Sequence, residues 1–236
     1  MTRGEADLQL LPILTDRDGI SVDIGANMGL YVDHLTRLSS HVIAFEPIPA
    51  MHATLARHYP RIQLENTALS DENGEAELRM PLGLTALATL APSNQFNLPA
   101  VETVSFRVPK RTLDSYDLKG VHFIKIDVEG HEEAVLRGAR DTIARERPNI
   151  MAELEDRHNN GMIDRVRTLM AELSYEGYFW DAGRLSSIET FNAVTDQISD
   201  NVGRDGKTGR YINNFVFVPV ERRRDIESRA AVIAAA

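Results

Sequence analysis

The sequence contains no cysteine and no excess of positive charge. Without cysteine, disulfide bonds, thiolate catalysis and cysteine-based zinc sites are excluded. The formal net charge of −9 argues against general nucleic-acid binding, because neutralising phosphates requires clustered lysine and arginine. No apolar run approaches the roughly 18 residues that a membrane span requires. No basic region followed by an apolar core stands at the N-terminus, so we expect a cytoplasmic protein.

What is present fits one α/β domain. Hydrophobic residues make up 43% and charged residues 26% of the chain, which is ordinary for a globular protein. Apolar strand-like segments alternate with helical segments along the chain. The strand-like segments lie near 20–24, 41–45, 61–66, 121–127 and 148–154. The helical segments lie at 29–38 and 48–58, after the strand at 121–127 as far as about residue 144, and at 161–174. This alternation predicts βαβ units and a mainly parallel sheet. We expect antiparallel pairs between 75–80 and 101–108 and between 175–180 and 214–220, with a long loop at 81–100.

A glycine turn after the first strand is the most informative local feature. The apolar strand ending at Ile24 leads into Gly25, Asn27 and Gly29, and amphipathic helical sequence follows. Such a turn lets the backbone approach a ligand closely and directs free N–H groups at it. Glu46 ends the second strand, where an acidic side chain usually holds a ribose hydroxyl pair. The pattern predicts a site for a cofactor that contains adenosine.

Five motifs in order resemble the FkbM family of S-adenosylmethionine-dependent methyltransferases. They are Val22–Tyr31, Val42–Pro47, Asn66–Asp71, Thr112–Ser115 and Phe123–Glu132, and the closing segment Asn214–Pro219 fits as well. The resemblance implies a class I methyltransferase fold: a Rossmann-like, doubly wound, mostly parallel seven-stranded sheet with an antiparallel last strand. The methyltransferase domain would cover 20–220, with an N-terminal helical extension at 1–19 and a C-terminal tail at 221–236.

The resemblance also implies the activity and the cofactor. Known members methylate hydroxyls on natural products and sugars, so we expect S-adenosylmethionine as cofactor and O-methylation of a small-molecule acceptor. Asp23 would face the cofactor's ammonium group, and Gly25, Asn27 and Gly29 would contact its methionine portion. Glu46 would bind the ribose, and Thr67, Ala68 and Leu69 would border the adenine. The alternative for the glycine turn is a plain strand–helix turn, and for Glu46 it is a solvated strand end. The alternative for Thr67, Ala68 and Leu69 is an ordinary core edge.

Asp127 and His131 follow the fourth strand, at the carboxyl edge of the sheet where such folds bind ligands. Asp127 would hold the cofactor's amino group, ligate a metal or orient the substrate. His131 is the candidate general base because its ordinary pKa lies near neutrality. The alternative for His131 is a residue that hydrogen-bonds backbone at the start of a helix.

A magnesium site is a further expectation. Some sugar-modifying members of the family bind Mg²⁺ through a fourth-strand aspartate and acidic residues that end the fifth strand. Asp127, Glu153 and Glu155 would supply the hard oxygen ligands that Mg²⁺ prefers. Alternatively, Glu153 orients backbone or a substrate hydroxyl and the other acidic residues are surface charge. His158, just beyond the fifth strand, is a residue in reserve.

Two rival functions are weighed against methyl transfer. A nicotinamide-dependent oxidoreductase predicts a third glycine that closes G-x-G-x-x-G, and Tyr31 and Val32 follow Gly29 instead. A cofactor-binding module without activity is the other rival, and the intact set of Asp23, Glu46 and Asp127 speaks against it. The identity of the acceptor and the formation of a homo-oligomer stay open at this point.

Overall fold

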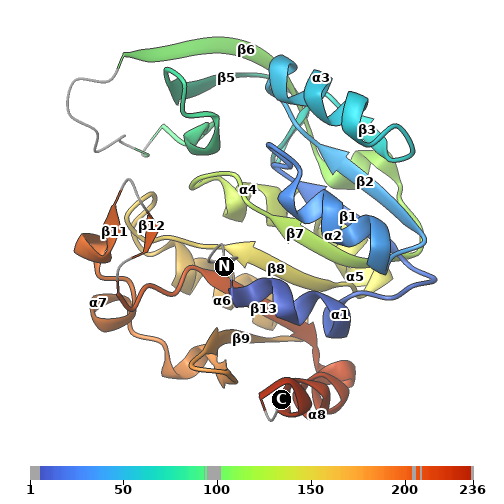
Figure 1. The fold of residues 1–236 in the computed structure, drawn as a ribbon, viewed down its shortest axis with the longest axis vertical. Helices are drawn as coiled ribbons and strands as arrows, with labels where there is room; N and C mark the ends of the chain where they lie inside the picture. The colour runs from blue at the N-terminus through green and yellow to red at the C-terminus, as the bar shows by residue number, and fades with distance from the viewer. Residues whose placement is uncertain (1–5, 93, 95–101, 204–205, 208, 235–236) are drawn as a thin grey trace.

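A computed structural model of the chain describes residues 6–92, 94, 102–203, 206–207 and 209–234. Its centre is an eight-stranded sheet (Figure 1). In spatial order the strands are β10 (Arg184–Ser187), β9 (Tyr175–Asp181), β13 (Asn214–Pro219), β8 (Asn149–Glu153), β7 (Val121–Ile126), β1 (Ile20–Ile24), β2 (His41–Phe45) and β3 (Gln63–Glu65). The mostly parallel α/β architecture is confirmed.

The strand pairing agrees with the sequence prediction except for one added strand. β1 lies between β2 and β7, parallel to both, and β13 is antiparallel to β8 and β9. The sheet has one strand more than the expected seven, because the chain reverses after β9 and forms β10 beside it. Ala182 and Gly183 form this tight turn with positive φ values of 47° and 81°. A turn with two positive φ values suits the twist of a hairpin.

Helices cover both faces of the sheet and form two apolar cores. On one face α4 (Glu132–Arg137), α5 (Arg140–Glu146) and α6 (Met162–Glu172) bury residues such as Val135 and Val166 against the strands. On the other face lie η1 (Ala6–Leu10), α1 (Leu11–Leu14), α2 (Leu30–Leu38) and α8 (Arg223–Ala234). α3 (Pro49–His58) packs Leu55 against Val32 and Ala44.

The helix expected to run to about residue 144 is interrupted. α4 ends at Arg137 and α5 begins at Arg140, with Gly138 between them. A methyl group built on Gly138 would lie 1.9 Å from the carbonyl oxygen of Ser70. The close approach of this carbonyl explains why glycine stands there.

A second, three-stranded sheet extends from the domain, on the side opposite α8 in Figure 1. It has the order β4 (Ala68–Leu69), β6 (Thr103–Arg111) and β5 (Gly74–Pro81), and the expected antiparallel pairing of the two long strands is confirmed. The expected loop at 81–100 contains η2 (Thr85–Leu87), and its residues 93 and 95–100 lie outside the described part. The backbone of Thr89 bridges back to Arg79 of β5.

The remaining elements are short. They are η3 (Leu113–Tyr116), η4 (Ile188–Thr190), α7 (Ala193–Asp196), η5 (Ser199–Asn201), β11 (Val202–Gly203), β12 (Gly206–Lys207) and η6 (Val220–Arg222). Among the described residues, no helix has both the length and the apolar character that a bilayer crossing needs.

Candidate active site

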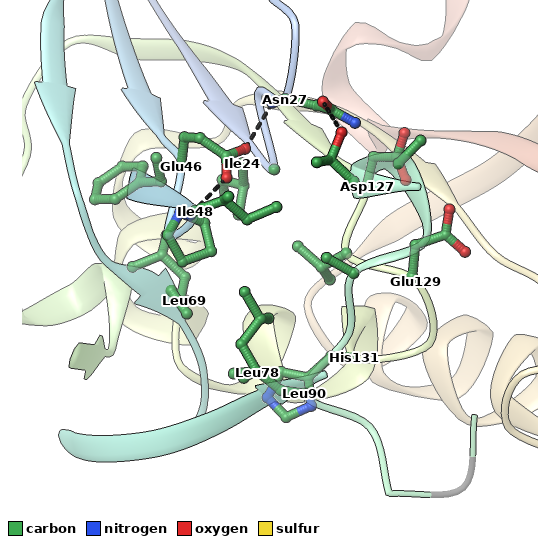
Figure 2. A pocket seen from close by; sticks show the side chains of 18 of the residues that line it. Ile24, Asn27, Glu46, Ile48, Leu69, Leu78, Leu90, Asp127, Glu129 and His131 are labelled. Atoms are coloured by element: carbon green, nitrogen blue, oxygen red, sulfur yellow. Dashed lines mark hydrogen bonds between the residues drawn. The ribbon is translucent and has the colours of Figure 1, made fainter. Parts of the chain in front are cut away.

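A cavity of about 260 Å³ lies at the carboxyl ends of the parallel strands, beneath η2. Residues at the ends of β1, β2 and β7 line it together with residues of the second sheet (Figure 2). The lining includes Gly25, Asn27, Glu46, Ile48, Thr67, Ala68, Leu69, Leu78, Thr85, Leu90, Asp127, Val128, Glu129, His131 and Glu153. Most residues singled out from the sequence therefore meet in one place.

The glycine turn has the left-handed backbone that its sequence predicts. Gly25, Asn27 and Gly29 have φ values of 84°, 45° and 86°. A methyl group on Gly25 would lie 1.9 Å from the carbonyl oxygen of Asp127, so the ends of β1 and β7 approach too closely for any side chain there. Gly25 and Asn27 line the cavity, whereas Gly29 begins α2 and packs against Leu55.

Glu46 is held firmly at the end of β2. The residue is only 2% exposed, and its carboxylate accepts backbone N–H bonds from Asn27 at 2.7 Å and Ile48 at 2.8 Å (Figure 2). Burial raises the pKa of Glu46 to about 7, and the two N–H donors oppose this rise. Each carboxylate oxygen accepts one backbone bond and has capacity for a second, so the group can receive a pair of hydroxyl donors from the cavity.

Small and apolar residues form one wall of the cavity. Thr67, Ala68 and Leu69 follow β3, and Leu78 of β5 and Ile48 complete this wall. Such a surface suits the face of a flat aromatic ring, because it can exclude water from both ring and wall.

Asp23 lies deeper than its neighbours and is not among the cavity-lining residues. The N–H of Val32 bonds to its carboxylate, which is 2% exposed. Within the described part of the chain, its Oδ2 atom has no hydrogen-bond partner. Burial raises the pKa of Asp23 to about 7, and the buried Lys125 on the neighbouring strand opposes this rise. A buried carboxylate oxygen of this kind favours a polar or cationic partner.

Asp127 and His131 both reach the cavity, from either side of the turn after β7. The Oδ2 atom of Asp127 lies 3.9 Å from Nζ of Lys125, and its side chain is one-third exposed. His131 Nε2 lies 2.9 Å from Oγ of Ser70, whose hydroxyl donates to Asp71 at 3.0 Å. Burial lowers the pKa of His131 below 6.5, so its ring is neutral at neutral pH.

The acidic residues expected to bind Mg²⁺ have protein partners. Asn213 donates to both Glu153 and Glu155, and Arg157 pairs with Glu155. Glu155 is buried and is not among the cavity-lining residues. Among the described residues, no three His, Asp or Glu side chains stand together in a way that could hold a metal ion. The residues present do not fit the expected site, and we assign no metal ligand in this chain.

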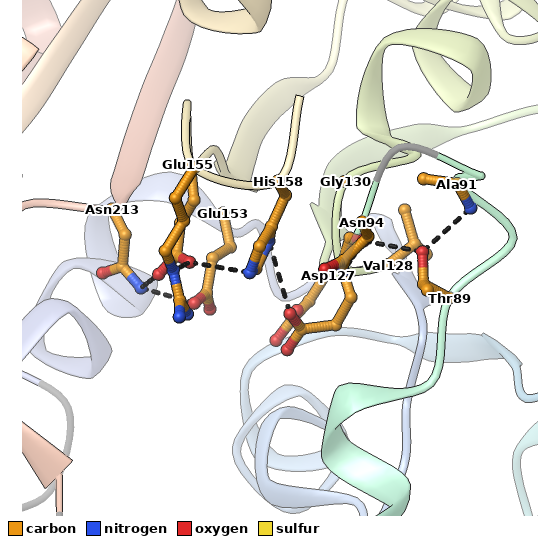
Figure 3. A network of polar contacts seen from close by, with 12 residues as sticks. Thr89, Ala91, Asn94, Asp127, Val128, Gly130, Glu153, Glu155, His158 and Asn213 are labelled. Carbon is orange, nitrogen blue, oxygen red and sulfur yellow. Dashed lines mark hydrogen bonds and ion pairs between the residues drawn. The ribbon is translucent and has the colours of Figure 1, made fainter. Parts of the chain in front are cut away.

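Glu129 is the cavity residue that the sequence reading missed, and His158, held in reserve, is its partner. Nδ1 of His158 lies 3.5 Å from Oε2 of Glu129, and Figure 3 shows the contact of His158 with its other partner, Glu155. A signal existed for Glu129, since it lies between Asp127 and Gly130 in the motif Phe123–Glu132. Its contact with His158 connects two separate strand ends, and no local pattern reports that pairing.

The comparisons with known proteins agree with this geometry. The family model described as Methyltransferase FkbM domain matches residues 23–177. Methyltransferase 1 of Beauveria bassiana is 30% identical over 178 residues, which cover 65% of this chain and 70% of that protein. Hexuronic acid methyltransferase AglP of Haloferax volcanii is 28% identical over 147 residues, which cover 60% of this chain and 59% of that enzyme.

Solved structures show the fold. Methyltransferase FkbM from Methylobacillus flagellatus aligns with a TM-score of 0.54 at 17% identity, covering 86% of this chain and 44% of that one. An rRNA methylase from Streptococcus thermophilus aligns at 0.51 with 11% identity, covering 93% and 98% of the two chains. A Streptococcus mutans protein in complex with SAH also aligns at 0.51, with 10% identity and coverage of 92% and 99%. The fold is that of class I methyltransferases, and the chain is a methyltransferase that belongs to the FkbM family.

Proposed function

We propose that this chain transfers a methyl group from S-adenosylmethionine to a hydroxyl of a sugar or natural-product small molecule. The observation that carries the proposal is the buried Glu46 carboxylate, which lies across one cavity from Asp127 (Figure 2). An acid that ends the second strand beside a glycine turn suits a ribose, and the acids at the far side suit the reacting end of the cofactor.

The residues present fit the cofactor at three places. Glu46 would accept the two ribose hydroxyls, and the wall of Thr67, Ala68 and Leu69 would border the adenine. Asp127 would receive the ammonium group, and the unsatisfied Oδ2 of Asp23 adds negative potential behind it. When bound, S-adenosylmethionine supplies an activated methyl group on a sulfonium, so the protein chiefly provides alignment and a place for the proton.

His131 is the proposed proton acceptor, with Asp127 as the group that orients the acceptor or the cofactor's amine. The hydroxyl of Ser70 donates to Asp71, so its oxygen accepts a bond from Nε2–H of His131. This arrangement selects the tautomer in which Nδ1 carries the lone pair. A neutral imidazole with a free lone pair can take the hydroxyl proton as the acceptor oxygen bonds to the methyl carbon.

A sugar or natural product as acceptor is supported by the family and by one relative. AglP of Haloferax volcanii is a hexuronic acid methyltransferase, and O-methylation of a hydroxyl is the matching chemistry here. Segment 81–100 would close over the site and help to choose the acceptor. The described part of that segment already reaches the cavity through Thr85, whose hydroxyl lies 3.3 Å from Oδ1 of Asn27.

Calorimetric titration with S-adenosylmethionine, S-adenosylhomocysteine and NAD tests the cofactor. We expect micromolar binding of both sulfur compounds and none of NAD. Absence of binding by either sulfur compound would overturn the proposal. Release of S-adenosylhomocysteine in the presence of neutral sugars or polyketide hydroxyls then tests the reaction, and tight cofactor binding without turnover of any acceptor would favour a binding module.

A further inference from the structure

Glu129 occupies a strained corner between β7 and α4. Its φ value is 54°, and Gly130 follows with 97°. A left-handed backbone is unfavourable for a side chain such as glutamate, so surrounding contacts must maintain it. The carbonyl oxygen of Glu129 accepts bonds from Oγ1 of Thr89 at 2.7 Å and Nδ2 of Asn94 at 2.8 Å. The connection between β5 and β6 therefore fixes the backbone of this corner.

The two residues that hold Glu129 are themselves fixed by Arg79 of β5. Its guanidinium donates to the carbonyl oxygen of Ala91 at 2.8 Å and to that of Asn94 at 3.2 Å. The backbones of Arg79 and Thr89 exchange bonds of 3.0 and 2.9 Å. These bonds connect Thr89 and Asn94 to β5.

The side chain of Glu129 is fixed at its other end. His158 lies between two carboxylates: Nδ1 is 3.5 Å from Oε2 of Glu129, and Nε2 is 3.2 Å from Oε2 of Glu155. Arg157 pairs with the same oxygen of Glu155. The Glu129 side chain is 15% exposed and its residue lines the cavity. The backbone of Glu129 is therefore held by hydrogen bonds, and its carboxyl group contacts His158 at the edge of the cavity.

The charged side chains that line the cavity have one sign. Among the described residues that line it, four are carboxylic acids (Glu46, Asp127, Glu129 and Glu153) and none is lysine or arginine. Burial and the neighbouring charges of Asp127 and Glu153 raise the pKa of Glu129 well above 4.5, and a cation placed beside Glu129 would lower that pKa and favour the ionised carboxylate. Burial lowers the pKa of His158 to about 4, so this partner is uncharged at neutral pH. A further anion placed here would meet repulsion.

We propose that Glu129 contacts the acceptor group that receives the methyl, and that this group and its immediate surroundings are uncharged or cationic. An acceptor with a carboxylate or phosphate next to the reacting atom is then rejected, unlike the hexuronic acid in the name of the Haloferax relative. This inference rests on the proposed function, because it assumes that the cofactor's methyl group points toward the end of the cavity that Glu129 lines.

Two cofactor analogues test it without knowledge of the acceptor. Sinefungin carries an amine-bearing carbon where S-adenosylmethionine has its methyl sulfonium, and S-adenosylhomocysteine has no group at that place. A cation bound by Glu129 makes a charge-assisted hydrogen bond, so sinefungin should bind wild-type protein about tenfold more tightly than S-adenosylhomocysteine. In Glu129→Gln this affinity ratio should fall about fivefold while the affinity for S-adenosylhomocysteine changes less than about twofold.

Glu46→Gln is the matched control from the opposite end of the same cavity. It should weaken both analogues alike and leave their ratio within about twofold of wild type. The proposal is overturned if wild-type protein binds the two analogues equally, or if Glu129→Gln leaves the ratio unchanged. Failure of wild-type protein to bind either analogue would instead overturn the proposed cofactor. Unchanged binding of S-adenosylhomocysteine by Glu129→Gln also shows that this variant is folded.

Discussion

Replacing Glu46 by glutamine tests the assignment of the ribose site most directly. In the structure both carboxylate oxygens accept a backbone N–H bond, from Asn27 and Ile48, and each can accept one hydroxyl in addition. Glutamine keeps one acceptor oxygen and places an NH₂ group against the other N–H. The variant therefore loses one charge-assisted bond to the ligand, which contributes about 1.5–3 kcal/mol to binding. This loss corresponds to a dissociation constant that is roughly 10- to 150-fold larger.

Calorimetry with S-adenosylhomocysteine measures this loss. Glu75→Gln is a suitable control because Glu75 is an exposed residue on β5, outside the cavity lining. We expect the control to bind like wild type. A Glu46→Gln variant that has a normal melting temperature and binds S-adenosylhomocysteine within about threefold of wild type would refute the reasoning. Loss of a buried carboxylate that bonds to the ligand must weaken binding more than that.

The pH dependence of binding provides a second readout of the same residue. The pKa of Glu46 is about 7 in the free protein, above its ordinary value of 4.5. Below pH 7 the carboxyl carries a proton that must leave when ribose hydroxyls bind the ionised form. The affinity of wild-type protein therefore falls as the pH drops through 7 and is level above it. In Glu46→Gln the slope of log affinity against pH should decrease by about one, and an unchanged slope would assign the titration to another group.

Three further substitutions follow from the same geometry. Gly25→Ala should abolish binding of S-adenosylhomocysteine and lower the melting temperature, because its methyl group would lie 1.9 Å from the carbonyl oxygen of Asp127; normal binding would show that the turn can relax. His131→Asn should reduce kcat about 100-fold with little change in cofactor affinity. A reduction of kcat by less than about fivefold would show that His131 is not the general base. Phe123→Ala should destabilise the protein by about 3–5 kcal/mol in urea unfolding because this ring is fully buried, and a cost below about 1 kcal/mol would contradict the packing described.

Much of the fold follows from local sequence. The first strand, the glycine turn and Glu46 lie within one continuous stretch, so their pattern of apolar and special residues predicts both structure and position. The strand β10 was not predicted because the turn before it contains Ala182 with a positive φ, and alanine is not a residue type that indicates such a conformation. The close approach of Gly138 to the carbonyl of Ser70 escaped prediction because the two residues are distant in sequence.

The candidate site divides in the same way. Residues at strand ends meet because parallel strands place their carboxyl ends at one edge, and that rule needs only the order of the elements. The contact between Glu129 and His158 depends on how two loops fold toward each other, and the bonds from Thr89 and Asn94 come from a third segment. Side-chain partnerships between loops carry no periodic signal. The same limit applies to the expected Mg²⁺ ligands, whose partners Asn213 and Arg157 only the folded chain reveals.

The apolar core shared by α1 and α8 has a consequence for the order of assembly. The two helices contact each other, and Arg229 donates to the carbonyl oxygen of Pro12. Together they cover Tyr178 and Trp180 on the sheet. During synthesis this core cannot close until residues near 230 have left the ribosome, so the nascent chain exposes this apolar surface until then. Shortening α8 would make that transient state permanent, and such a chain should aggregate rather than fold.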